Sequence, residues 1–430
     1  MNKLKRLSPV RIIVLGFISL ILIGTFILLL PLSRNDGVII TFIDALFTAT
    51  SAVCVTGLTV VNTTQSYSAF GKTIIALLIQ IGGLGVATVG VGVSLVIGQK
   101  IGFNERKLIN ETYSLNSMKG IVNILKFILY ITLVFESIGA ILCFTVFIKD
   151  YPPIKALGTS LFHSISSFNN AGFDILENPS GLEFYQNNIL LNLITVILII
   201  FGGLGFRVIR EIFSKRKFKR LSLHAKIVIT TTVFLLIAGT ITIKFNEDIN
   251  WIGALFYSGS ARTAGFSTYS LGDFSSLSLF TLILLMYIGA SPGSTGGGIK
   301  TTTIFTALRS SYCIARNRHI TAFKRKIPNS VVQKSFMLVF ISLLLICIDT
   351  FVIMILEPDF SFIQILFEVV SAFATVGLST GITAQLSILS KILIIITMFV
   401  GRLGPLTIIS LLAGKKLSNV FYSEESYTIG

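Results

Sequence analysis

Long apolar stretches alternate with short polar ones along most of the chain. Eight of the apolar stretches reach or approach the length of about 20 residues that a helix needs to cross a bilayer. They cover residues 11–30, 72–97, 121–147, 188–210, 226–245, 276–308, 332–356 and 388–412. The first is too long for the apolar core of a signal peptide, and no small-x-small cleavage site follows it. The pattern therefore predicts eight membrane-spanning helices.

A shorter segment lies between the two stretches of each successive pair, and the four short segments share a pattern. In three of them Ser follows Phe by four residues and Gly follows Ser by six. These three are Phe47–Ser51–Gly57, Phe162–Ser166–Gly172 and Phe367–Ser371–Gly377. The fourth, Phe256–Ser260–Gly265, is one residue shorter between Ser and Gly. None can span a bilayer, so we expect four segments that enter the membrane and return.

The repeating unit is therefore a helix, a pore loop and a second helix, and it occurs four times. We predict an all-α membrane protein with four such repeats around a pseudo-fourfold pore. The expected repeats are residues 1–120, 121–225, 226–330 and 331–412, followed by a cytoplasmic C-terminal tail at 413–430. The tail is polar and too short to fold alone, so it is either loose or docked on a partner subunit.

Composition and charge agree with a protein surrounded by lipid. Of the 430 residues, 53% are hydrophobic and 13% are charged, whereas soluble domains carry about 25% charged residues. A net charge of +16 in a soluble protein would suggest nucleic acid as a partner. Here most of the 35 Lys and Arg lie in the N-terminus and in segments 100–126, 207–226, 300–334 and 415–416. These segments share one side of the membrane if each repeat crosses and returns. Such a bias marks the cytoplasmic side, so we expect both termini in the cytoplasm and no nucleic acid partner.

The four glycines indicate a filter for a dehydrated monovalent cation. Rings of backbone carbonyls from four equivalent loops can replace the water around such an ion, and glycine permits the backbone conformation that this requires. Short helices expected at 41–53, 156–168, 250–261 and 361–373 would direct the negative ends of their dipoles toward the ion. The expected filter residues are Val55, Thr56, Gly57, Asn170, Ala171, Gly172, Thr263, Ala264, Gly265, Thr375, Val376 and Gly377. Helix packing or a simple turn is the alternative role for a single glycine of this kind, but four in one register favour the filter.

A second glycine pattern lies in the second apolar stretch of each repeat. Gly82–Gly85, Gly202–Gly205 and Gly401–Gly404 align residue by residue, and small residues let helices pack closely in lipid. The sixth stretch departs from the pattern over Gly289, Ala290, Ser291, Pro292, Gly293, Ser294, Thr295, Gly296, Gly297 and Gly298. Pro292 removes a helical hydrogen bond, and the five glycines favour unwinding. We expect an irregular loop that gates the pore below the filter. A phosphate-binding loop is excluded because Ile299 stands where that motif needs glycine.

Arg402 is a lone cation in the last apolar stretch. A charge at such a depth is costly and usually functional, so we expect Arg402 to form an electrostatic barrier and to hydrogen-bond the carbonyls of residues 290–298. Glu136 and Asp349 are also intramembrane, and each is equally well explained as a buried hydrogen-bond partner. The four cysteines and three histidines have no metal-ligand spacing. The apolar stretches carry no Ser/His, paired Asp or HExxH constellation, so an enzyme is not expected.

Together, the four loops, the Gly-rich break and Arg402 resemble the Trk/Ktr/HKT superfamily of potassium transporters over residues 10–412. In size the chain is most similar to the membrane subunit of a Ktr-type bacterial system. It departs from the family pattern in its shorter third loop and in Cys54, where threonine is frequent. The resemblance implies uptake of K+, often with a dependence on Na+, across the bacterial plasma membrane. It also implies a homodimer, a cytosolic ring of RCK-type subunits that alone binds nucleotide, and no covalently bound cofactor.

A secondary active transporter of another small solute is the alternative function. Such proteins alternate between two states around a central site and also use discontinuous helices. Four re-entrant filters are not expected in that class, and ion flux that follows the electrochemical gradient without a coupled solute would favour the channel-like mechanism.

Overall fold

The computed structural model describes residues 9–97, 120–177 and 181–405, together with positions 102, 106, 109, 110 and 407. The tail expected at 413–430 lies outside the described residues. The described chain is almost entirely helical, and within it the only sheet is an antiparallel pair of two-residue strands, β1 (Thr321–Ala322) and β2 (Arg325–Lys326). The predicted all-α class is therefore confirmed.

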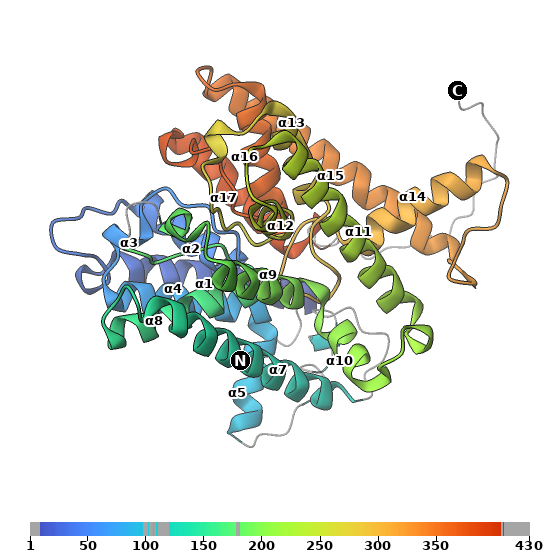
Figure 1. The fold of residues 1–430 in the computed structure, drawn as a ribbon, viewed down its shortest axis with the longest axis horizontal. Helices are drawn as coiled ribbons and strands as arrows, with labels where there is room; N and C mark the ends of the chain where they lie inside the picture. The colour runs from blue at the N-terminus through green and yellow to red at the C-terminus, as the bar shows by residue number, and fades with distance from the viewer. Residues whose placement is uncertain are drawn as a thin grey trace.

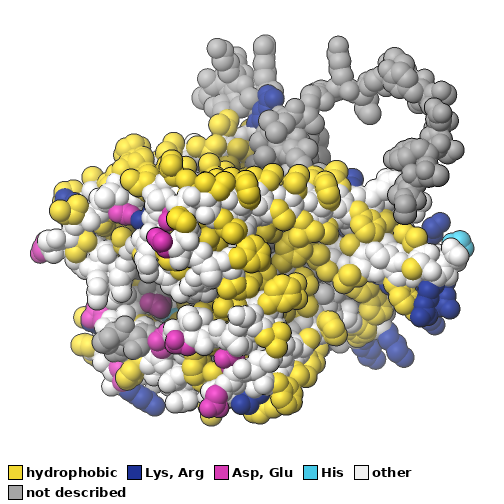
Figure 2. All heavy atoms as spheres, turned by 90° about the horizontal axis from the view of Figure 1, so that it is seen from above, with side chains coloured by type: hydrophobic (Ala, Val, Ile, Leu, Met, Phe, Trp, Pro, Cys, Tyr) yellow, Lys and Arg dark blue, Asp and Glu magenta, His cyan; other side chains and the backbone are white. Residues whose placement is uncertain are grey.

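In the described part of the chain, four helices are individually long and apolar enough to cross a membrane. They are α1 (Pro9–Leu29), α7 (Ile121–Phe147), α11 (Leu223–Asn246) and α15 (Asn329–Leu356). Only 28% of the most apolar stretch of α15 is buried inside the protein. Figure 2 shows that hydrophobic side chains cover much of the surface between the two ends of the molecule. Because such a surface is stable only against lipid, the fold is that of a multi-pass membrane protein.

A short helix follows each of these long ones. The short helices are α2 (Phe42–Cys54), α8 (Pro153–Phe168), α12 (Trp251–Ser260) and α16 (Phe362–Ala374). Polar caps fix where they begin: Thr41 and Asp44 form a capping box at α2, and the Asn250 side chain accepts the Gly253 N–H of α12 at 2.6 Å. The ends differ by three residues or fewer from those expected from the sequence. Each short helix is thus a half-span that ends inside the protein.

The second helix of each repeat is bent or broken, whereas the sequence predicted a break only in the sixth stretch. Helix α4 (Ala69–Leu84) meets α5 (Val86–Val96) at 97°, and α9 (Ile189–Leu204) meets α10 (Phe206–Lys215) at 99°. Gly85 and Gly205 lie at the two corners with φ of 84° and 87°, a backbone conformation that ends an α-helix. The continuous spans 72–97 and 188–210 were therefore wrong, because the apolar pattern runs through the corner without a change.

The third and fourth second helices also stop at irregular backbone. Helix α13 (Ser276–Tyr287) is separated from α14 (Thr301–Ala315) by the Gly-rich segment, and α17 (Ile388–Leu403) is followed by Gly404 with φ of 84°. The remaining short elements are η2 (Pro31–Ser33), α3 (Thr63–Ser66), η3 (Gly181–Tyr185), η4 (Phe218–Arg220), η5 (Leu271–Asp273) and η6 (Thr383–Gln385).

Helix α12 is seen nearly end-on at the centre of Figure 1, between the N-terminal and C-terminal halves of the chain. Each half-span helix packs against the long helix before it and the second helix after it. Each also packs against the second helix of the neighbouring unit: α8 on α4, α12 on α9, α16 on α13, and α2 on α17. The last contact joins the beginning of the chain to its end, so the order of contacts closes on itself.

Candidate functional site

The four loops that leave the half-span helices meet in one ring of backbone contacts. A Cβ placed on Gly57 would lie 2.4 Å from the carbonyl oxygen of Ala171 in the second loop. A Cβ on Gly172, Gly265 or Gly377 would likewise lie 2.5, 2.1 or 2.1 Å from the carbonyl oxygen of Ala264, Val376 or Thr56. Each glycine therefore lies against the middle residue of the next loop, and the fourth loop returns to the first. No residue with a side chain fits at these four contacts.

In each loop the backbone angle φ changes sign twice within three residues. The four glycines have φ between 70° and 95°, and the residues two places before them, Val55, Asn170, Thr263 and Thr375, have φ between 51° and 76°. Thr56, Ala171, Ala264 and Val376 between them are not among the residues with positive φ. A strand whose φ alternates in sign turns successive carbonyls toward the same side. Non-glycine residues at positive φ are strained, which is typical of functional backbone.

The Ser of each repeat holds the backbone around its glycine. In the first and fourth loops the hydroxyl oxygens of Ser51 and Ser371 accept the N–H of Gly57 and Gly377, both at 3.0 Å. In the second and third loops the hydroxyls of Ser166 and Ser260 donate to the carbonyls of the residues after the glycine, at 2.8 and 2.6 Å. The constant spacing seen in the sequence therefore reflects a hydrogen bond across the loop.

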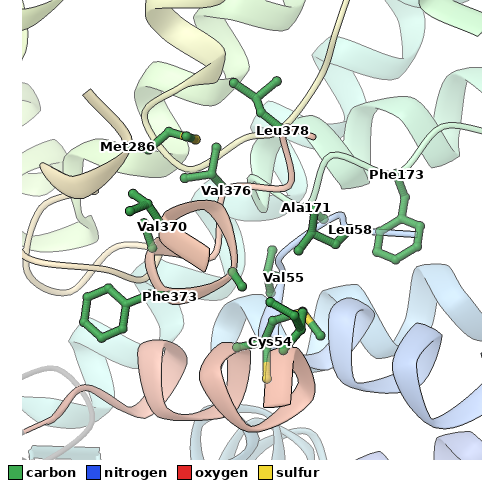
Figure 3. Close-up of a cluster of buried hydrophobic side chains, with 14 of the residues drawn as sticks. Cys54, Val55, Leu58, Ala171, Phe173, Met286, Val370, Phe373, Val376 and Leu378 are labelled. Atoms are coloured by element: carbon green, nitrogen blue, oxygen red, sulfur yellow. The ribbon is translucent and has the colours of Figure 1, made fainter. Parts of the chain in front are cut away.

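Buried apolar side chains pack around the ring. Figure 3 shows Val55, Ala171 and Val376 close together, from the first, second and fourth loops. Each glycine is followed by a large side chain that is at most 1% exposed: Leu58, Phe173, Phe266 or Leu378. The ring is thus fixed from outside by close packing, which limits how far its backbone can relax.

A cavity of about 290 Å³ opens on one side of the ring. All four glycines line it, together with polar residues that include Asp174 and Glu183. Figure 2 shows acidic side chains around a hollow at one end of the molecule and the largest clusters of Lys and Arg toward the opposite end. The cavity is therefore an acidic entrance that concentrates cations.

Asp174 lies in the irregular segment after Gly172, outside the membrane-spanning helices. Burial raises the pKa of its carboxyl to about 6, the backbone N–H of Leu176 opposes that rise, and the nearby Glu183 adds to it. Burial, and then the charge of Asp273, also raise the pKa of Glu183. The charge of this entrance therefore changes between neutral and mildly acidic pH. Asp174 could not be identified from the sequence, because its cavity forms only when the four loops meet.

The Gly-rich segment lies on the other side of the ring. Gly296 and Gly297 contact the side chains of Thr263 and Thr375, which lie two residues before Gly265 and Gly377. The Gly297 N–H donates to the Thr375 hydroxyl at 3.0 Å. The segment also crosses to the corner of α9, where Ser291 N–H donates to the Gly203 carbonyl at 3.0 Å. It is thus held between the second repeat and the fourth.

Arg402 connects this segment to the first repeat. Its guanidinium donates to the carbonyl of Thr295, and on the other side to the carbonyls of Gly82 and Gly83. A planar group with several donors is suited to joining separate carbonyls. Beyond the segment is a second cavity of about 270 Å³, whose lining includes Arg402, Lys300 and Pro292. The segment and Arg402 therefore separate the ring from this cavity.

Sequence reasoning missed two charged residues at the site. Lys300 directly follows the Gly-rich segment, and its ammonium donates to the carbonyls of Gly296 and Gly297 at 2.8 and 3.2 Å. Glu368 lies in α16, 1% exposed, and the hydroxyl of Thr383 donates to it. A charged residue inside an apolar stretch was the available signal in both cases.

The other intramembrane acids lie outside the ring and make hydrogen bonds. The Glu136 carboxylate accepts from the side-chain amides of Gln80 and Asn169 at 3.3 and 3.0 Å. The Asp349 carboxylate accepts from the Thr397 hydroxyl at 2.7 Å. Among the described residues, no three His, Cys, Asp or Glu side chains are grouped so that they could hold a metal ion.

The aligned glycines of the second helices pack against the half-span helices. A Cβ on Gly82, Gly202 or Gly401 would lie 2.0, 2.0 or 1.9 Å from the carbonyl oxygen of Val53, Phe168 or Phe373, four residues before the ring glycine of the same repeat. The packing role expected for these glycines therefore agrees with their position.

The chain is similar to known cation transporters along most of its length. The profile of a family described as TrkH, cation transport protein, matches residues 8–247 and 226–422. The potassium/sodium uptake protein NtpJ of Enterococcus hirae is 39% identical, over 99% of this chain and 98% of that protein. The Ktr system potassium uptake protein B of Bacillus subtilis is 36% identical, over 97% and 96% respectively. The crystal structure of the potassium transporter TrkH from Vibrio parahaemolyticus matches with a TM-score of 0.74 at 21% identity, over 96% of this chain and 86% of that one.

Proposed function

The chain belongs to the TrkH family of cation transport proteins, and on that premise we propose that K+ crosses the membrane through the ring of four loops. The chain is a membrane subunit for potassium uptake and a transporter rather than an enzyme. The observation that carries the assignment of the pathway is the closed ring of contacts from Gly57 through Gly172 and Gly265 to Gly377.

The filter consists of the three residues that end at each glycine. These are Val55, Thr56 and Gly57, then Asn170, Ala171 and Gly172, then Thr263, Ala264 and Gly265, then Thr375, Val376 and Gly377. Alternating φ supports carbonyls that face a common axis, where they replace the hydration shell of the ion. The half-span helices add the negative ends of their dipoles. The four repeats that supply these loops are residues 1–120, 121–225, 226–330 and 331–412. The proposed K+ uptake depends on Na+.

The gate is the segment from Gly289 to Gly298 together with Arg402. Its support is the position of the segment between the ring and the second cavity, and the guanidinium contacts that bridge Thr295 to Gly82 and Gly83. Opening requires those hydrogen bonds to break. Replacing Arg402 with Ala is therefore expected to raise K+ flux into proteoliposomes at unchanged protein content, and an unchanged or lower flux would remove the gate from the proposal.

The filter is tested by measuring K+ and Na+ uptake into proteoliposomes for Gly57→Ser and Gly377→Ser. Both substitutions place a side chain against a neighbouring carbonyl and at φ above 90°, so the preference for K+ over Na+ is expected to fall strongly. Gly37→Ser is the matched control, since Gly37 also has positive φ but a Cβ there meets nothing within 4 Å. Unchanged selectivity in both filter variants would contradict the proposal.

The partner subunits, the membrane and the orientation of the chain are proposed from the same family assignment. The Bacillus subtilis relative is named as a protein of a Ktr system, and we extend to this chain an assembly with further subunits. Its form here is a homodimer on a cytosolic ring of RCK-type subunits that bind the nucleotide. The chain lies in the bacterial plasma membrane with both termini in the cytoplasm. Uptake measured with and without the co-purified cytosolic subunit tests this part.

A further inference from the structure

One position in each half-span helix differs in chemistry among the four repeats. The residue directly after the shared Phe is Thr48, His163, Tyr257 or Glu368. All four are buried or nearly so. In the third and fourth repeats this side chain reaches across to the strand that follows the filter glycine.

Glu368 belongs to a cluster of hydrogen bonds with Ser379 and Thr383 in the fourth repeat. The Gly381 N–H donates to the Ser379 hydroxyl at 3.0 Å, and the Ser379 and Thr383 hydroxyl oxygens lie 2.9 Å apart. The Thr383 hydroxyl donates to the Glu368 carboxyl group, and the Ser379 side chain also hydrogen-bonds to that group. Ser379 is two residues after Gly377 and lines the entrance cavity. The carboxylate therefore holds the strand that leaves the ring.

Tyr257 makes the equivalent connection in the third repeat. Its hydroxyl donates to the carbonyl of Tyr269 and accepts the N–H of the same residue at 2.9 Å. The Ser267 hydroxyl lies 2.8 Å from the Tyr257 hydroxyl, and Ser267 is two residues after Gly265. Two different side chains at one position of the repeat thus hold the same part of the loop.

The first two repeats lack this brace among their described hydrogen bonds. The Thr48 hydroxyl donates to the Asp44 carbonyl within its own helix at 2.8 Å. The His163 ring nitrogen Nε2 lies 2.8 Å from the Thr195 hydroxyl of α9. The third and fourth loops, which are neighbours in the ring, are therefore braced from behind in a way that the other two are not.

We propose that Glu368 is a positioning residue that sets the selectivity of the filter by holding the strand after Gly377, with Tyr257 as its counterpart in the third loop. This inference rests on the proposed function of the ring. A binding site works best when its ligands are held to within about 0.5 Å of the productive geometry.

The test uses proteoliposomes and compares the ratio of K+ to Na+ uptake among variants of the full chain. Glu368→Ala and Thr383→Val each remove the hydrogen bond and are expected to lower the ratio at least fivefold. Glu368→Gln keeps an acceptor and Thr383→Ser keeps the hydroxyl, so both are expected to stay within about twofold of the unchanged protein. Asp349→Asn is the matched control, because Asp349 also accepts from a threonine in a membrane helix but does not contact the filter loops.

The outcomes separate this inference from the function on which it rests. A normal ratio in Glu368→Ala and Thr383→Val, with a low ratio in Gly377→Ser, would overturn the role of Glu368 and leave the filter in place. A normal ratio in Gly377→Ser would instead contradict the filter itself. A lower melting temperature without a change in ratio would make Glu368 a structural residue only, which also overturns the inference. If Glu368→Ala does not fold, the pair Thr383→Val and Thr383→Ser decides.

Discussion

Single residues show how a constant spacing in the sequence becomes a defined backbone. The distance from Ser371 to Gly377 is fixed because the Ser hydroxyl must reach the glycine N–H, and the same holds for Ser51 and Gly57. In the third repeat Ser260 instead donates to the Phe266 carbonyl, which a loop one residue shorter still allows. The spacing could be read from the sequence, but the direction of each hydrogen bond could not, since it depends on how each loop turns.

Asp174 leads to a prediction about pH. With a pKa of about 6, its carboxylate is ionised at pH 7.5 and largely protonated at pH 5. Loss of the charge lowers the local cation concentration in the entrance cavity. One unit charge at close range in water is worth about 1 kcal/mol, or roughly fivefold in concentration. K+ uptake at limiting K+ is therefore expected to fall severalfold from pH 7.5 to pH 5, and Asp174→Asn should show the lower rate at both pH values.

Asp36 provides the control for that measurement, because it is acidic and exposed but does not line the cavity. Asp36→Asn is expected to keep the pH response of the unchanged protein. A response that survives in Asp174→Asn would show that another group titrates.

At the scale of whole elements, helix positions were predictable and helix bends were not. The half-span helices could be recognised in the sequence by polar caps such as Thr41 with Asp44 and by their position between two long apolar stretches. The bend at Gly205 could not be predicted from the sequence. Apolar residues flank it, and the Gly-Gly-Leu-Gly run is equally well explained by close helix packing. Only the contact with the Gly-rich segment, in which Phe206 N–H donates to the Gly293 carbonyl at 3.1 Å, shows what the corner serves.

Gly205→Ala therefore has an expected effect on gating. A Cβ on Gly205 would lie 2.6 Å from the Pro292 carbonyl oxygen, so the Gly-rich segment must move, and K+ flux should rise. Gly404→Ala carries similar strain at φ of 84° but meets nothing within 4 Å. Both variants are expected to lose roughly 1–3 kcal/mol of stability from the backbone conformation, measured as lower melting temperatures. Equal flux in the two would show that the contact with Pro292 has no part in gating.

For the whole molecule, the sequence predicted four repeats around a common pore, but it did not identify the contacts through which the loops meet. Four similar segments are compatible with a ring or with separate bundles. The contact of Gly377 in the last loop with Thr56 in the first is what closes the ring. Such a contact between distant segments leaves no mark in local periodicity, and neither does the outer cavity that contains Asp174.

The orientation in the membrane predicts which surfaces a reagent can reach. Ile39 is 85% exposed beside the first half-span helix, and Lys324 is exposed between β1 and β2 among basic residues. In a background with the exposed Cys347 replaced by Ser, Ile39→Cys should react with a membrane-impermeant thiol reagent in intact cells. Lys324→Cys should react only after permeabilisation. The opposite pattern would reverse the positive-inside assignment.

The most direct test of the ion pathway is a crystal structure of the protein soaked with Tl+ or Rb+, with anomalous difference density calculated around the ring. We expect the strongest peak on the axis between the backbone carbonyls of the four loops, among Thr56, Ala171, Ala264 and Val376. Strong peaks elsewhere in the protein, with none between these loops, would contradict the filter.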